Sequence, residues 1–179
     1  MSIQDVIKNR VSTIKFTTEW VNPEKLIEFL EVAVYAPNHK MRQPWRFIIL
    51  EGHGKDRFLE NYLKLYKDNE RNEKKELLTK VFSAPAIVSI IMKKNSVLAD
   101  ELEDMQACAA LIQNFLLLLE DQKMGSFWKT PKYIESDKFK DALGVQGDEL
   151  VLGLIMVGYP LVKLEPKKRT SARLLTTIY

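Results

Sequence analysis

The sequence predicts an α+β fold, a three-layer α/β/α sandwich in which helices pack on both faces of a mixed central sheet. Short apolar runs typical of buried strands alternate with longer segments of helical periodicity. Helical segments dominate, and neither an internal repeat nor a linker-like stretch is visible in the 179 residues. We therefore expect one domain, residues 1–179, which is long enough to bury a core without disulfide or metal support.

The first two helices have recognisable start signals. Ser2 and Asp5 have the spacing of a capping box, which predicts a short helix at the N-terminus. Asn22, Pro23 and Glu24 supply in turn an N-cap side chain, a proline at the first helical position and an acid near the positive end of the helix dipole. That second helix must end before the next proline along the chain.

Sequence pattern and turn residues place the remaining elements. Apolar runs predict strands, and segments with a period of 3.6 residues predict helices. We expect Gly52 to end the first strand in a turn and Gly125 to close the longest helix. Residues 174–179 are strand-like but have no obvious place in a monomer. The expected strands are residues 47–50, 87–92, 126–128 and 151–157, and the remaining expected helices are residues 56–67, 70–82, 98–123 and 136–143.

The longest expected helix is apolar on nearly all sides in its second half. Three amides, Gln106, Gln113 and Asn114, interrupt its most apolar stretch, which is too short and too polar to span a bilayer. We therefore expect no membrane association and a buried helix, enclosed either by the sheet and other helices or by a second subunit.

Composition excludes several function classes. The net charge is only +3 and the lysines are scattered among acids, which argues against nucleic acid as a partner. The single cysteine, Cys108, cannot form an internal disulfide and lies in an apolar run. We expect a buried, inert thiol in a reducing compartment, the cytoplasm. The N-terminal residues lack the apolar core of a signal peptide.

The sequence also lacks the common motifs for side-chain chemistry. His39 and His53 are the only histidines and have no partner at metal-ligand spacing, so we expect no metal site. The sequence contains no nucleophile elbow, no phosphate-binding loop and no G-x-G-x-x-G fingerprint. An enzyme with these features can still act if a cofactor carries the chemistry.

One segment resembles a known family. Residues 36–47, APNHKMRQPWRF, resemble the A-P-[S/D/N]-x4-Q-P-W-x-F block of the nitroreductase family, and are closest to a small subgroup with A-P-[D/N]-H. An expected helix leads into the block and an expected strand leaves it. Weaker matches occur in the family's order. Arg10-Val11-Ser12 matches an R-R-S phosphate motif, and residues 125–129 (GSFWK) resemble a G-x-x-W-[R/K] strand. Residues 151–160 (VLGLIMVGYP) resemble a late strand that is closed by G-x-P.

The resemblance implies a domain-swapped homodimer with FMN in the interface, each FMN touched by both chains. It further implies an oxidoreductase that takes hydride from NADH or NADPH onto N5 of the flavin. The electrons then pass to a nitroaromatic, a quinone or a similar planar acceptor. Because the flavin carries the chemistry, no side chain is expected to be catalytic. A swapped dimer would also give the C-terminal tail a place.

The resemblance suggests which residues hold the flavin phosphate. Arg10 and Ser12, with Val11 between them, are the expected ligands, because a phosphate needs clustered cations and hydrogen-bond donors. Arg169, in the basic C-terminal run, is expected to add charge there. Each arginine has an ordinary alternative, which is a helix-dipole partner for Arg10 and a solvated basic turn for Arg169.

Two other segments are expected to meet the flavin ring. Tyr35 and His39 belong to the loop that should reach the ring. Phe127, Trp128 and Lys129 would lie along it, with the lysine near its pyrimidine end. Core packing is the alternative for Phe127 and Trp128.

Three residues depart from the family pattern. Val11 and Lys15 stand where relatives often have arginines, and Met41 stands where many have an asparagine that hydrogen-bonds the ring, a bond that methionine cannot donate. Two alternatives therefore remain open. One is a diverged member that binds flavin with weak or no reductase activity, and the other is a cofactor-free dimeric binding module.

Overall fold

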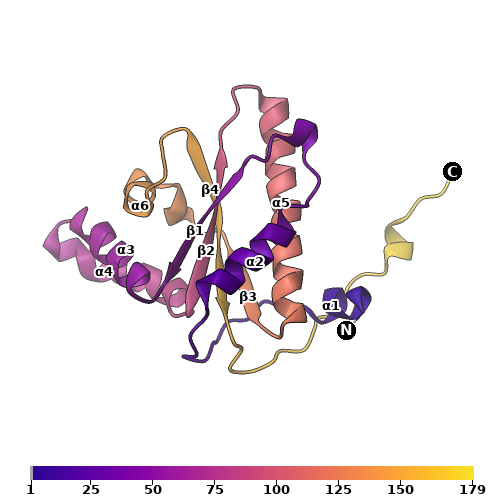
Figure 1. Ribbon diagram of the computed structural model, residues 1–179, viewed down its shortest axis with the longest axis horizontal. Helices are drawn as coiled ribbons and strands as arrows, with labels where there is room; N and C mark the ends of the chain where they lie inside the picture. Colours follow the sequence, from indigo (N-terminus) through magenta and orange to yellow (C-terminus); the bar gives the residue numbers. More distant parts are fainter. Residues whose placement is uncertain (1) are drawn as a thin grey trace.

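The computed structural model describes residues 2–179 and contains one four-stranded sheet, in the order β1-β2-β4-β3 (Figure 1). All three strand pairs are antiparallel. The parallel pairing among the described residues is a single bridge between Ser12 and Ser126, so the mixed character expected of the sheet is confined to this edge. The strands are β1 Trp45–Glu51, β2 Ala86–Lys93, β3 Gly125–Lys129 and β4 Glu149–Gly158.

Helices cover both faces of this sheet, which confirms the three-layer α+β prediction (Figure 1). One layer contains α1 Ile3–Asn9, α2 Pro23–Ala33 and α5 Leu98–Asp121, and the other contains α3 Gly52–Lys64, α4 Asp68–Phe82 and α6 Asp137–Leu143. Short 3-10 turns occupy His39–Met41, Lys132–Glu135 and Ala172–Leu175.

The core is divided by the sheet into two apolar clusters. Along β4, Ile155 and Val157 belong to the α5 side, whereas Leu154 and Met156 belong to the α3 side. This alternation follows from the two-residue period of a strand. Because both faces of β4 are covered, its sequence after Glu149 is a continuous apolar run, as a strand in the middle of three layers requires.

α5 is buried on one side and open on the other. By length and composition it is the one helix within residues 2–179 that could cross a membrane, yet it packs against the sheet through Leu111, Phe115 and Leu119. These three side chains are fully buried, as expected of a core helix.

Local signals place the helix starts correctly. Ser2 and Asp5 form the expected capping box, in which the Asp5 amide donates to the Ser2 hydroxyl at 3.2 Å and the Ser2 amide donates to the Asp5 carboxylate at 3.1 Å. Asn22 accepts from the Glu24 amide at 3.0 Å, and Pro23 opens α2.

Two expected turns are placed differently by the structure. Lys123, not Gly125, takes the left-handed conformation that ends α5, with φ 60°, and the Met124 amide then donates to the Leu119 carbonyl at 2.9 Å. Gly125 is the first residue of β3 instead. Gly52, with φ 43°, opens α3 directly after β1, so the expected turn is the first turn of a helix.

The C-terminal tail does not form the expected strand. Residues 172–175 form a 3-10 turn, and the last four residues have no regular structure. Leu174, Leu175, Ile178 and Tyr179 are exposed, and the tail extends away from the body of the subunit (Figure 1). A strand needs a partner for its backbone groups, and within residues 2–179 no strand pairs with this tail.

Candidate functional site

The N-terminal segment that follows α1 is held against the edge of the sheet. The Thr13 amide donates to the Ser126 carbonyl at 2.9 Å, next to the bridge between Ser12 and Ser126. Gly125 permits this close approach, since a Cβ there would lie 2.5 Å from the Thr13 hydroxyl oxygen. The residues of this extended segment alternate, so Arg10 and Ser12 point to the side opposite to that of Thr13.

A cavity of about 290 Å³ opens beside this segment, and we call it the basic cavity. It brings together five of the nine predicted cofactor residues, namely Arg10, Val11, Ser12, Phe127 and Arg169. Ile14, Leu164, Glu165 and Lys167 complete the lining. Of these, Ile14 could have been found from the alternation that follows Arg10 and Ser12, whereas nothing in the sequence indicates Leu164 or Glu165.

The charges around the basic cavity favour an anion. Arg10, Lys167 and Arg169 contribute three cations against the single carboxylate of Glu165. The Arg169 guanidinium donates to the Lys167 backbone carbonyl at 2.7 Å. Within residues 2–179, neither arginine forms an ion pair with a carboxylate, and the Ser12 hydroxyl adds a donor. Clustered guanidinium groups with a hydroxyl are the donor set that recognises a phosphate.

β3 separates the three aromatic-strand residues onto two faces. Phe127 lines the basic cavity, and the Lys129 ammonium lies 4.4 Å from the centroid of the Phe127 ring on the same face. Trp128 points to the other face, where its indole N–H donates to the Leu152 carbonyl at 3.3 Å and its ring covers Gly153. The structure therefore brings Phe127 and Lys129 together and places Trp128 away from the basic cavity.

Tyr35 and His39 lie in a different part of the subunit. Both side chains are exposed, and Tyr35 is 88% accessible. His39 lines a second cavity of about 390 Å³ between the loop and α5, which we call the loop cavity. Its lining residues are Pro37, Asn38, His39, Glu103, Gln106, Ala107 and Ala110.

The two cavities lie near opposite ends of α5. Ala107 belongs to the loop cavity, whereas Glu120 lines a smaller cavity that shares Val11 and Leu164 with the basic cavity. Thirteen positions of helix correspond to about 20 Å along its axis. In a single chain, His39 and Arg10 are therefore far apart.

The loop between α2 and β1 has a constrained backbone. Lys40, Met41 and Gln43 all adopt positive φ, at 51°, 52° and 45°. Left-handed conformations of residues other than glycine cost about 1–3 kcal/mol each, so surrounding contacts must hold them in place. Asn38 supplies one contact, because its side-chain oxygen accepts from the Gln43 amide at 3.1 Å.

Arg42 supplies the other contacts and was not anticipated from the sequence. Its guanidinium donates to Asp104 at 2.7 Å, to Glu103 at 2.9 Å and to the Asp100 carbonyl at 3.2 Å, all on α5. The hydrogen bonds to Asp104 and then Glu103 raise the pKa of the Arg42 guanidinium. The acids lie about sixty positions away in sequence, so no local pattern could have revealed the cluster.

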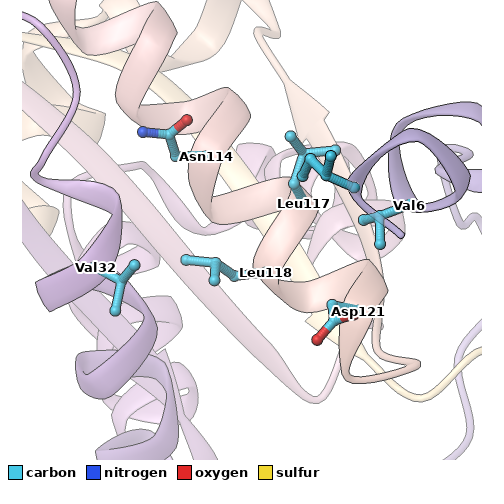
Figure 2. Close-up of a pocket in the computed structure, with 7 residues that line it drawn as sticks. Val6, Val32, Asn114, Leu117, Leu118 and Asp121 are labelled. Atoms are coloured by element: carbon cyan, nitrogen blue, oxygen red, sulfur yellow. The ribbon is translucent and has the colours of Figure 1, made fainter. Parts of the chain in front are cut away.

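An apolar groove lies on the side of α5 that the sheet does not cover. Figure 2 shows Val6 of α1 and Val32 of α2 facing Leu117 and Leu118 of α5, around a hollow of about 350 Å³. Ile3, Asn114 and Asp121 complete its lining. Part of α5 is thus left accessible by the rest of the described chain. A second subunit, one of the two covers expected from the sequence, would bury this groove.

Comparison with known proteins identifies the family to which this sequence and fold are similar. A model of the nitroreductase family matches residues 7–159. YfhC of Bacillus subtilis, named as an NAD(P)H nitroreductase, is 30% identical over 176 residues, which cover 96% of this chain and 91% of YfhC.

Solved structures agree with the family match. The crystal structure of a nitroreductase-like family protein from Bacillus cereus has a TM-score of 0.90 and 30% identity, and covers 100% of this chain and 96% of its own. At the level of the fold, a protein from Desulfovibrio desulfuricans that is named as a nitroreductase and was solved in complex with FMN has a TM-score of 0.76 and 21% identity, and covers 100% of this chain and 98% of its own. The chain therefore belongs to the nitroreductase family.

Proposed function

We propose that this protein is an FMN-dependent oxidoreductase that takes electrons from NADH or NADPH and passes them to a nitroaromatic, a quinone or a similar planar acceptor. The observation that carries the proposal is the basic cavity. It gathers Arg10, Ser12 and Arg169 from segments more than 150 positions apart in sequence, with no acid paired to either arginine within residues 2–179. Family membership and the name of the Bacillus subtilis relative support the same reading.

The residues present fit the phosphate of FMN. Arg10, Arg169 and Lys167 would neutralise its charge, and the Ser12 hydroxyl would donate a hydrogen bond. Val11 is a wall of the cavity, so the arginine that relatives often have at this position is replaced by apolar surface. The basic C-terminal run compensates for the lost charge.

Bound FMN would supply the two-electron chemistry, which no side chain of this protein needs to provide. Phe127 would pack against the ligand and exclude water, and Lys129 would provide positive charge beside it. We assign no catalytic side chain. We assign Trp128 no contact with FMN, because it points to the opposite face of β3 and its hydrogen bond to Leu152 ties β3 to β4.

The working unit in this proposal is a homodimer with FMN at the interface. Ala107, beside His39 in the loop cavity, lies about 20 Å along α5 from Glu120, which lines the cavity adjoining the basic cavity, so the loop of one subunit would meet the FMN held by the other. Two features of the single chain support this arrangement: the uncovered groove of Figure 2, and the exposed apolar residues of the extended tail. We place the protein in the cytoplasm, where its one buried cysteine stays reduced.

The test begins with absorbance spectra of the purified protein with and without added FMN, followed by anaerobic titration with NADH and with NADPH. Flavin bands that bleach with either nucleotide and return on addition of p-benzoquinone or nitrobenzene are the expected result. The faster donor identifies the coenzyme. Sedimentation or light scattering of the same sample measures whether the flavin-bound form is a dimer.

Two outcomes would contradict the proposal. A bound flavin that neither nucleotide reduces would indicate a diverged family member, in line with the departures at Val11, Lys15 and Met41. Protein that stays colourless with excess FMN would indicate a binding module that uses no cofactor.

A further inference from the structure

Arg42 joins the loop of residues 38–43 to α5. Its side chain is only 19% exposed, and the carboxylate of Asp104 that receives it is 5% exposed. Within residues 2–179, the three acids on α5 around Arg42 have no other cation within ion-pair distance. The cluster is therefore one guanidinium fork that spans about one turn of α5, and a change at Arg42 removes each of these ion pairs between the loop and the helix.

The cluster is connected directly to the loop cavity. Glu103 both accepts from Arg42 and lines the cavity. On the loop side, the Arg42 amide donates to the His39 carbonyl at 3.1 Å, which closes the 3-10 turn that carries His39. Arg42 thus contacts both walls of the cavity, the loop wall through its backbone amide at His39 and the helix wall through its guanidinium at Glu103, and the guanidinium holds the loop backbone that carries His39 against α5.

The conformation that Arg42 holds is not one that the loop would adopt unaided. Left-handed backbone at Lys40, Met41 and Gln43 is unfavourable in an unrestrained chain. Without the fork, the Asn38 side chain is the remaining side-chain tie across the turn. We expect the loop then to relax and the position of His39 to spread over several conformations.

From this geometry we propose that Arg42, through its ion pair with Asp104, is a positioning residue that sets the shape of the loop cavity. The shape of this cavity in turn determines how tightly the planar acceptor binds. The inference rests on the proposed function, since it assumes that the loop cavity of one subunit lies beside the flavin that the basic cavity of the other subunit holds. Arg42 itself touches neither the flavin phosphate residues nor the acceptor.

The first experiment compares wild type with Arg42→Gln and Arg42→Lys. For Arg42→Gln we expect a KM for p-benzoquinone raised by roughly tenfold or more, because the wall of the loop cavity that carries His39 is no longer held in place. FMN affinity should stay within about twofold of wild type, because the charged hydrogen bonds of the basic cavity to the phosphate remain. Arg42→Lys should recover only part of the loss, because an ammonium cannot reach several acceptors as the fork does. Lys40→Gln, which removes an exposed charge from the same loop, is the matched control and should leave KM unchanged.

A second readout needs no cofactor. Amide hydrogen exchange of the FMN-free protein should become faster in residues 38–43 of Arg42→Gln and stay slow in the buried part of α5. If Arg42→Gln does not fold, Asp104→Asn, which keeps an acceptor oxygen but removes the charge, carries the same comparison. The double variant Arg42→Gln/Asp104→Asn should lose little more than either single variant, because the two groups act as a unit.

The results separate three possibilities. A lower melting temperature with unchanged KM and unchanged loop exchange would show a merely structural pair and overturn the inference. Loss of FMN binding in Arg42→Gln together with the KM change would overturn it as well, since the role assigned is confined to the acceptor. Wild-type protein that takes up no FMN would refute the proposed function, and the inference with it, before any variant is measured.

Discussion

Removal of the Arg10 guanidinium tests the basic cavity most directly. Arg10 is half-buried beside Ser12 and, among residues 2–179, has no carboxylate partner, so its hydrogen-bonding capacity is available to a ligand. A hydrogen bond to a charged group contributes about 1.5–3 kcal/mol. We therefore expect Arg10→Ala to weaken FMN binding by roughly 10- to 150-fold, with 1.4 kcal/mol for each factor of ten.

Riboflavin separates the phosphate from the ring in the same experiment. It lacks the phosphate, so Arg10→Ala should leave riboflavin affinity almost unchanged. Fluorescence quenching titrations of both ligands with both proteins give the four dissociation constants needed. The loss of FMN affinity should also shrink at high salt, because salt screens exposed charge interactions.

Lys8→Ala is the matched control, since it removes the same charge from an exposed position in the last turn of α1. It should leave both affinities unchanged. If FMN and riboflavin affinities fall together in Arg10→Ala, the arginine supports the fold of the segment and does not bind phosphate. A loss of FMN affinity below about threefold, less than one charged hydrogen bond provides, would refute the assignment of the basic cavity.

Three further predictions concern stability and reactivity. Gly125→Ala would place a Cβ 2.5 Å from the Thr13 hydroxyl oxygen. Overpacking of this kind costs about 1–3 kcal/mol, and an unchanged melting temperature in calorimetry would show that the N-terminal segment moves freely. The hydrogen bonds from Arg46 lower the pKa of Glu149, so the carboxylate stabilises the fold above its unfolded pKa of about 4.3 and that contribution is lost as the pH falls through the lower folded value. The difference in urea midpoint between wild type and Glu149→Gln should therefore be largest near pH 7 and shrink below about pH 4.3, whereas a pH-independent difference would contradict this linkage. Burial raises the pKa of the Cys108 thiol to about 12, so Ellman's reagent should label it only after unfolding, and rapid labelling of the native protein would show that α5 opens.

The sequence by itself determined the secondary structure and the layers. Ser2 with Asp5, and Asn22 with Pro23, are signals that act over a few residues, so the structure has helices where those signals place them. Apolar runs placed the central strands β2 and β4 to within a few residues, because burial on both faces requires a continuous apolar sequence. The edge strands β1 and β3 were placed equally closely from shorter runs. The resemblance likewise singled out five residues that the structure brings into one cavity. Their role in binding FMN stays a prediction that the titrations above test.

Only the tertiary structure decided the features that depend on distant partners. The order β1-β2-β4-β3 and the antiparallel pairing are properties of how strands meet, which no single strand encodes. Trp128 and Phe127 point to opposite faces because neighbouring residues of a strand alternate, but only the packing of β3 decided that the Phe127 face is the one beside the basic cavity.

The same reason explains why the Arg42 cluster and the separation of the two cavities were not foreseen. Arg42 meets Asp104 across 62 positions, and the loop that carries it has left-handed backbone at Lys40, Met41 and Gln43, which no local sequence pattern indicates. The distance between His39 and Arg10 follows from the length of α5, because His39 lies beside the N-terminal half of this helix and Arg10 lies near its C-terminal end. Local sequence fixes which element forms, whereas the free energy of packing one element on another fixes which side chains share a site.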